Sequence, residues 1–215
     1  MAIQEIKLAR PFNSFKPHYS DYILEFDASL NGMGFILYKK ENNIEIIICA
    51  CSINTDRYNF GIESRYQNTS EYISAVLEII LSTKYLRDNG IHLSSIALRG
   101  DSKVALAWMD NESTKGSFAT RAIALLALTS ARKEIFISET IHIFTNENNL
   151  ADKLSRNYSV NSIFNNKVID IMSYTGMMEN KEKILTFCDP MIGRKNEEEN
   201  FDSFWKSIIP FIDSL

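Results

Sequence analysis

Residues 22–51 read YILEFDASLNGMGFILYKKENNIEIIICAC, and this stretch decides the fold class. Apolar and β-branched residues gather in three short runs, which is a pattern typical of strands. Asn31-Gly32 and Asn42-Asn43 separate the runs, and both pairs favour tight hairpin turns because Asn and Gly tolerate a positive φ. We therefore predict an antiparallel meander of three strands. The three predicted strands are 22–27, 34–38 and 44–51.

Downstream of the meander, the hydrophobic period changes to that of a helix. Between residues 70 and 89, apolar side chains recur every three or four residues, and Asn89-Gly90 supplies a stop signal. Strands that precede helices, followed by strands that alternate with helices, predict an α/β fold: a five-stranded mixed sheet, antiparallel then parallel, flanked by helices. The further predicted strands lie within 91–99 and 135–144, and the further predicted helices are 103–109, 118–133 and 149–156.

The chain divides into three parts by composition. Residues 1–20 contain Pro11 and Pro17 without clear periodicity, and we interpret them as an irregular lead-in or linker. Residues 21–156 form the predicted α/β domain. Residues 157–215 shift to Asn, Ser and Lys and end in an apolar helical pattern, so we expect a helical C-terminal extension whose role the sequence does not assign.

The overall composition is that of a globular protein. The chain has 215 residues, 45% of them hydrophobic and 23% charged, which excludes disordered and collagen-like classes. A net charge of −4 argues against a partner bound through non-specific phosphate contacts. Three cysteines, with Cys49 and Cys51 on one face of a predicted strand, suggest buried thiols in a reducing compartment. Without a long apolar run or a signal pattern, we expect an intracellular protein, cytoplasmic or nuclear, without a membrane partner.

Four acidic residues lie at strand ends or helix starts: Asp27, Glu71, Asp101 and Asp152. Each has a structural interpretation by itself, as a turn former, a helix-dipole partner or an N-cap. Strand ends on one edge of a mixed sheet gather side by side, however, and helix starts can point at them. Four carboxylates that converge need a counter-charge, and a pair of divalent cations is the usual one where phosphodiesters are cut.

The segments around these carboxylates carry recognisable motifs, which are 26–34 (FDASLNGMG), 68–71 (NTSE) with Ala75, 99–102 (RGDS) with Ala105, Leu106 and Trp108, and 148–156 (NNLADKLSR). In this order they resemble the ribonuclease H domains of retroelement reverse transcriptases, over roughly residues 20–156. The last motif is the most specific and resembles gypsy-like and tyrosine-recombinase-type retrotransposons. Phe144-Thr145 stands where the family commonly has Pro-Gly, which changes the turn before the last helix.

The resemblance implies a ribonuclease H-like fold and a metal-dependent endonuclease that hydrolyses the RNA strand of RNA/DNA hybrids. It further implies that the four carboxylates are catalytic and bind two Mg²⁺ ions, for which Mn²⁺ could substitute. The implied partners are the RNA/DNA hybrid and a reverse transcriptase polymerase domain in the same polyprotein or complex. Contacts to 2′-hydroxyls or DNA phosphates are expected from Ser29, Asn31, Asn68, Ser70 and Ser102. For Ser70 and Ser102, helix capping is an equally good interpretation.

A second hypothesis is a weakly active or inactive module of the same fold that binds nucleic acid or has a structural role. The net charge favours this alternative, as does the lack of the loop histidine that many ribonucleases H use. His142 lies at the end of a predicted strand and is interpreted as a packed or turn histidine. The presence of all four carboxylates favours the nuclease. A transposase or integrase core would instead have Glu in place of Asp152.

Overall fold

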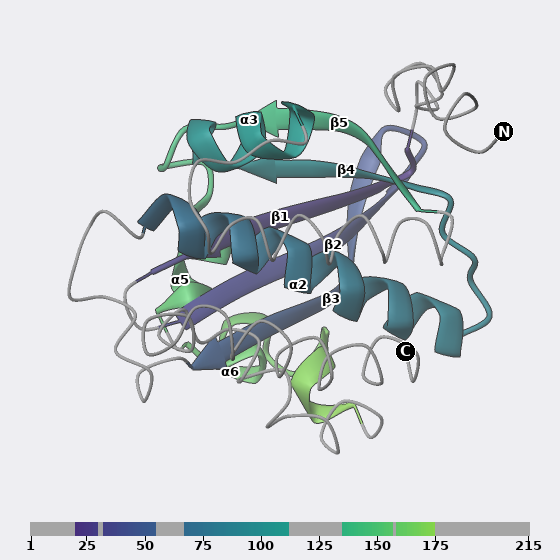
Figure 1. Ribbon diagram of the computed structural model, residues 1–215. Helices are drawn as coiled ribbons and strands as arrows, with labels where there is room; N and C mark the ends of the chain where they lie inside the picture. Colours follow the sequence, from purple (N-terminus) through teal and green to yellow (C-terminus); the bar gives the residue numbers. More distant parts are fainter. Residues whose placement is uncertain (1–19, 30–31, 55–66, 112–134, 157, 175–215) are drawn as a thin grey trace, which may run out of the picture.

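The computed structural model describes residues 20–29, 32–54, 67–111, 135–156 and 158–174 (Figure 1). Several predictions fall outside these residues, namely the lead-in as far as residue 19, the helix at 118–133, the apolar helical pattern that ends the C-terminal extension, and Asn31. The described residues form one mixed sheet with helices packed against it.

The sheet has six strands in the order β5-β4-β1-β2-β3-β6. The pairs β1–β2 and β2–β3 are antiparallel, whereas β1–β4, β4–β5 and β3–β6 are parallel. This confirms the expected mixed α/β class, an antiparallel meander followed by parallel strands, with six strands where five were predicted. The strands are β1 (Tyr22–Ala28), β2 (Gly32–Glu41), β3 (Ile44–Asn54), β4 (Ser95–Gly100), β5 (Phe136–His142) and β6 (Ile169–Asp170).

The second hairpin forms at the predicted turn. Asn42 and Asn43 both adopt positive φ, 51° and 64°, and they connect the paired residues Glu41 and Ile44. Two consecutive residues with positive φ make a turn whose twist matches that of the flanking strands. The Asn-Asn pair therefore sets the register of β3 on β2 next to the turn, and an irregularity between Leu37 and Tyr38 shifts the register further along.

Helices cover both faces of the sheet. Leu24 and Phe26 of β1 belong to the core that α2 and α3 complete, whereas Ile23 lies on the other face, in a cluster with side chains of α5 and α6. Figure 1 shows α2 running across the sheet. The helices are α2 (Gln67–Asp88), α3 (Lys103–Asn111), α5 (Asn149–Ser155) and α6 (Val160–Phe164), and a 3₁₀ turn, η4 (Ile171–Ser173), follows β6.

Helix α2 begins three residues before its predicted start. Gln67 is its first residue, so Asn68 and Ser70 lie inside the first turn, and Ser70 does not cap the helix. Glu71 consequently stands one turn further into the helix than the sequence suggested. At the other end the prediction is confirmed: Gly90 has a φ of 76° and Ile91 N–H donates to the carbonyl of Leu86 at 2.9 Å, which is a glycine-terminated helix end.

The sixth strand comes from the segment that the sequence analysis assigned to the C-terminal extension. β6 pairs in parallel with β3 through Cys49 and Ile169, and Val160 and Ile171 are buried. The edge of β3 would otherwise present unpaired backbone groups. Residues 160–173 therefore contribute to the same core as the preceding elements.

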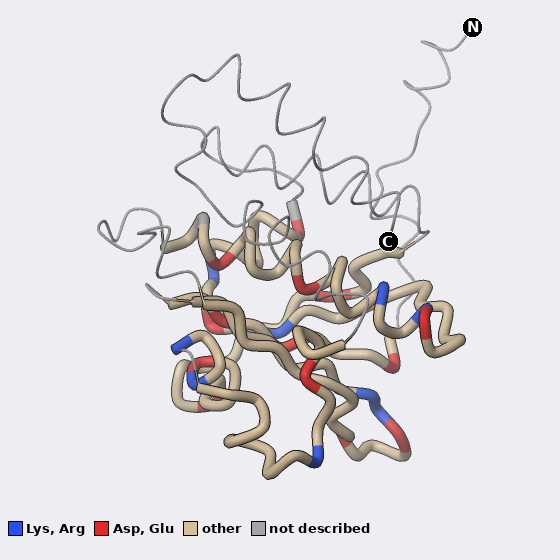
Figure 2. Tube along the Cα trace, turned by 90° about the horizontal axis from the view of Figure 1, so that it is seen from below, with Lys and Arg blue, Asp and Glu red and all other residues tan. Residues whose placement is uncertain are grey.

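Other features of the structure lie away from the acidic residues. Cys49 and Cys51 are buried in the core as expected, and Trp108 packs edge-on against Tyr72 with ring centroids 5.9 Å apart. Within the described segments, no helix combines the length and hydropathy needed to cross a membrane. Basic and acidic positions are interspersed along the described trace, without a single basic stripe (Figure 2).

Candidate metal centre

Three of the four predicted carboxylates meet at one end of the sheet. Asp27 belongs to β1, and Asp101 directly follows β4. Because β1 and β4 are parallel and pair at Glu25 and Arg99, Asp27 and Asp101 each lie two residues further along neighbouring strands. Glu71 reaches the same point from α2. One ligand oxygen of each carboxylate lies within 4.8 Å of the other two.

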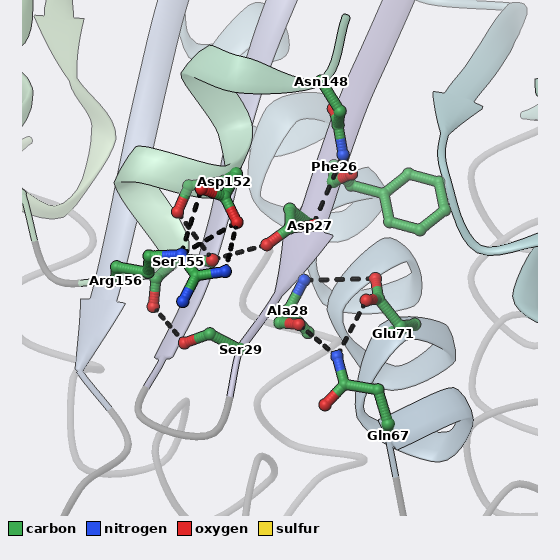
Figure 3. A network of polar contacts seen from close by, with 10 residues as sticks. All are labelled: Phe26, Asp27, Ala28, Ser29, Gln67, Glu71, Asn148, Asp152, Ser155 and Arg156. Atoms are coloured by element: carbon green, nitrogen blue, oxygen red, sulfur yellow. Dashed lines mark hydrogen bonds and ion pairs between the residues drawn. The ribbon is translucent and has the colours of Figure 1, made fainter. Parts of the chain in front are cut away.

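Both oxygens of Glu71 are held by hydrogen bonds. The backbone N–H of Ala28 donates to Oε2 at 3.1 Å, and the side-chain amide of Gln67 donates to Oε1 at 3.0 Å. The same Gln67 amide also donates to the carbonyl oxygen of Ala28. Gln67 therefore joins the start of α2 to the end of β1 and orients Glu71 toward Asp27 (Figure 3).

The Asp27 carboxylate accepts hydrogen bonds from Ser155 of α5 and from Asn148, the residue directly before α5. The Ser155 hydroxyl lies 2.5 Å from Asp27 Oδ2, and Asn148 Nδ2 lies 3.4 Å from Oδ1 and 3.1 Å from the carbonyl oxygen of Phe26 (Figure 3). Ser155 and Asn148 are both fully buried. Both residues belong to the motif at 148–156, and their sequence positions alone predict no role for them.

Close packing fixes α5 on the sheet beside Asp27. The Ser29 hydroxyl donates to the carbonyl oxygen of Ser155 at 2.6 Å, and the Ser52 hydroxyl donates to that of Leu154 at 2.7 Å. A Cβ atom at Gly34 would lie 2.4 Å from the backbone nitrogen of Ser155. Only glycine therefore permits this approach of helix to strand.

Asp152 lies in the first turn of α5 but outside the group of three carboxylates. Its side chain is bound by the Arg156 guanidinium: Nη2 lies 2.7 Å from Oδ1, and Nε lies 2.9 Å from Oδ1 and 3.0 Å from Oδ2. Asp152 is nevertheless close enough for its charge to act on Asp27. The structure thus assembles three carboxylates and holds the fourth at their side in an ion pair.

Burial makes this cluster electrostatically unfavourable without a counter-charge. Burial raises the pKa of Asp27 to about 6, the Ser155 hydrogen bond opposes that rise, and the charges of Asp101 and Asp152 add to it. The pKa of Glu71 is raised well above its usual value, first by burial and then by the charge of Asp27. Oxygen-only donors with this accumulation of negative charge suit a hard divalent cation such as Mg²⁺, Mn²⁺ or Ca²⁺. The site is therefore compatible with divalent metal binding.

A further buried carboxylate, Glu78, lies two turns beyond Glu71 on α2. Glu78 is fully buried, and its Oε1 accepts a 2.6 Å hydrogen bond from the Ser74 hydroxyl. Its Oε2 has no hydrogen-bond partner among the described residues. Burial raises the pKa of Glu78 well above its usual value, and the charges of Glu71 and Asp27 contribute in the same direction. Glu78 lies within an otherwise apolar helical pattern, so the sequence gives no signal that marks it as part of the site.

The candidate substrate-contact residues are placed in different environments. Ser102 accepts a hydrogen bond from the N–H of Ala105 at 3.3 Å, which is the geometry of a helix cap for α3. Ser70 is buried, whereas Asn68 is exposed in the first turn of α2. Ser29 bonds to α5 as described above. His142 is exposed rather than packed in the core, and its ring lies edge-on to Phe144 at 5.9 Å.

No family model matches this chain, and no curated protein matches it. Among solved structures, it is similar to an RNase H1 from the halophilic archaeon Halobacterium salinarum (15% identity, TM-score 0.44, covering 67% of this chain and 98% of the other). It is also similar to the N-terminal RNase H domain of a Mycobacterium tuberculosis protein (12% identity, TM-score 0.43, covering 63% of this chain and 96% of the other). A third similar structure is an RNase H1 isolated from compost (17% identity, TM-score 0.42, covering 66% of this chain and 96% of the other).

Proposed function

We propose that this protein is a ribonuclease H-type endonuclease that hydrolyses the RNA strand of RNA/DNA hybrids with the help of divalent metal ions. The observation that carries the proposal is the meeting of Asp27, Glu71 and Asp101 within 4.8 Å at the end of the sheet. Asp27 and Glu71 are only 6% and 4% exposed. Buried like charges destabilise a fold unless protons or a counter-ion neutralise them, and capping or turn formation gives no reason to bury these carboxylates together.

The chain's own residues prepare the site for metal. Gln67 and the Ala28 N–H leave Glu71 one defined orientation, and Ser155 does the same for Asp27. We propose that Asp152 completes the ligand set and that the cofactor is a pair of Mg²⁺ ions, with Mn²⁺ as a substitute. Two such ions, when bound, activate a water molecule and stabilise the leaving oxygen of a phosphodiester. The protein's contribution is the fixed position of the carboxylates.

Selectivity for a hybrid requires contacts to the 2′-hydroxyls of one strand and to the phosphates of the other. Asn68 is exposed one helical turn from Glu71 and remains our main candidate for such a contact. Ser29, Asn31 and Ser102 border the carboxylates in sequence and stay candidates. We infer no direct contact from Ser70, because its side chain is buried.

The context that we propose is retroelement reverse transcription. Its support is the motif at 148–156, in which the structure gives Asn148, Asp152, Ser155 and Arg156 contacts at the site. A reverse transcriptase polymerase domain, in the same polyprotein or complex, is the partner that follows from this context.

The test is cleavage of a labelled RNA/DNA hybrid by the full chain in Mg²⁺ or Mn²⁺. We expect products with 5′-phosphate and 3′-hydroxyl ends, and a loss of at least about 100-fold in Asp101→Asn, because removing a metal-binding charge disables the reaction. Glu139→Gln, which removes an exposed carboxylate of β5, is the matched control. No cleavage by the unaltered chain would contradict the nuclease, and equal cleavage of duplex DNA would contradict hybrid selectivity.

A non-catalytic nucleic-acid-binding or structural module is the second candidate function. The ion pair between Asp152 and Arg156 favours it, since it occupies a carboxylate that the nuclease would need. In that case the unaltered chain and Asp101→Asn would bind the hybrid equally well, and neither would cleave it.

A further inference from the structure

The ion pair on α5 has a geometry that bears on the metal centre. Three short contacts, between 2.7 and 3.0 Å, join the Arg156 guanidinium to both oxygens of Asp152. Oδ1 accepts two of these hydrogen bonds and Oδ2 accepts one, so the positive guanidinium occupies lone pairs that a metal ion would otherwise use. Arg156 and a cation therefore compete for the same atoms.

The backbone beside this pair is already in place. The fully buried Ser155 contacts Asp27 Oδ2 at 2.5 Å and the carbonyl oxygen of Asp152 at 2.9 Å. The α5 backbone at Asp152 is thus tied to the strand that carries Asp27 (Figure 3). The Asp152 carboxylate is therefore held by Arg156 on a helix whose position relative to Asp27 is already fixed.

The guanidinium is held weakly enough to leave. The Arg156 side chain is 60% exposed, and that of Asp152 is 26% exposed. Exposed ion pairs four residues apart on a helix are screened by water and contribute little to stability. A divalent cation flanked by Asp27, Glu71 and Asp101 would attract Asp152 and repel Arg156.

We propose that Arg156 is an exchangeable counter-ion for Asp152, which it holds away from the three clustered carboxylates until a divalent cation displaces it. Arg156 is a positioning residue in this scheme, because it acts through Asp152. It stabilises the metal-free site and lowers the affinity for the ion that Asp152 helps to bind. This inference rests on the proposed function, since it assumes that the carboxylates bind metal.

Mn²⁺ binding tests the scheme without any substrate. Isothermal titration calorimetry and electron paramagnetic resonance of the full chain would give the affinity and number of bound Mn²⁺ ions. If two Mn²⁺ ions bind, we expect Arg156→Gln to bind the one of lower affinity about twofold to fivefold more tightly than the unaltered chain does. This factor corresponds to the loss of an exposed ion pair of roughly 0.4–1 kcal/mol. Arg156→Lys, which has a single ammonium in place of the planar fork, should give an intermediate affinity.

Two controls separate this effect from a general change of charge. Lys153→Gln removes one positive charge from an exposed position of the same helix and should change Mn²⁺ affinity less than Arg156→Gln. In an Asp152→Asn background, Arg156→Gln should lose its effect. Equal effects of the two charge removals, or an undiminished effect in the Asp152→Asn background, would overturn the inference while leaving the proposed function intact. If the unaltered chain and Arg156→Gln both bind no Mn²⁺, the proposed function fails and the inference fails with it.

Discussion

Asparagine in place of Asp27 will stabilise the metal-free protein at neutral pH. Burial raises the pKa of this carboxyl from 3.8 to about 6 in the folded chain. Folding therefore opposes ionisation of Asp27, and this group's contribution to stability is fully present below about pH 4 and is lost as the pH rises through 6. A shift of about two pKa units corresponds to roughly 3 kcal/mol of destabilisation at pH 7.5.

Asparagine removes the free-energy cost of the buried charge but also weakens local hydrogen bonds. It can still accept a hydrogen bond from Ser155, although without the added strength of a charged acceptor, and its amide group would face the amide of Asn148. Losses of this kind amount to about 1 kcal/mol or slightly more. The net expectation is a gain of about 1–2 kcal/mol, or roughly 2–8 °C in melting temperature for a chain of this size.

The assay is urea denaturation and thermal melting in a metal chelator at pH 7.5 and pH 4.5. The advantage of Asp27→Asn should shrink by about 2 kcal/mol between these pH values, because folded Asp27 becomes neutral by itself as the pH falls. Glu139→Gln, at an exposed carboxylate, should show no such pattern. Mn²⁺ should stabilise the unaltered chain and not the variant. An advantage independent of pH, or none at pH 7.5, would refute the reasoning.

Three further predictions concern the support of the site. Gly34→Ala should destabilise the fold by roughly 1–3 kcal/mol in urea denaturation, because its Cβ would lie 2.4 Å from the backbone nitrogen of Ser155; a change below about 0.5 kcal/mol would contradict this packing. Ser155→Ala should raise the pKa of Asp27 further and weaken Mn²⁺ binding, as measured by calorimetry, since its hydroxyl favours the ionised carboxylate; unchanged affinity would count against that role. Glu78→Gln should favour stability more at pH 7 than at pH 4 in urea denaturation, because burial raises the pKa of Glu78 and the stability contributed by this group is lost as the pH rises; an effect independent of pH would contradict the raised pKa.

Local chemistry made much of the fold predictable. Short apolar runs with Asn-Asn between them produced the β2–β3 hairpin, since two consecutive residues of positive φ favour Asn or Gly. Gly90 ended α2 for the same reason. The start of α2 was misplaced because Asn68 and Ser70 are good capping residues by composition, whereas the folded chain uses Gln67 as the first helical residue, where it bonds to Glu71 and β1.

The acidic residues could be named in advance, but their arrangement could not. Asp27, Glu71 and Asp101 stood at strand ends and in a helix, and parallel pairing of β1 with β4 brought the first and third together. Asp152 followed a different course, since Arg156 lies four residues away on the same helix and binds it locally. That spacing was present in the sequence, yet only the folded chain shows that Asp152 pairs with Arg156 and does not join the three clustered carboxylates.

The Asn42-Asn43 turn and the C-terminal end of α2 depend on neighbours within a few residues, and so the amino-acid order alone determines them. The partners of the carboxylates depend on contacts across long separations: Ser155 reaches Asp27 over 128 positions and Asn148 reaches it over 121. The sixth strand and the burial of Glu78 are likewise set by what packs against them. Tertiary structure alone decided these features, because burial and hydrogen-bond distance belong to the folded chain and not to any local stretch of it.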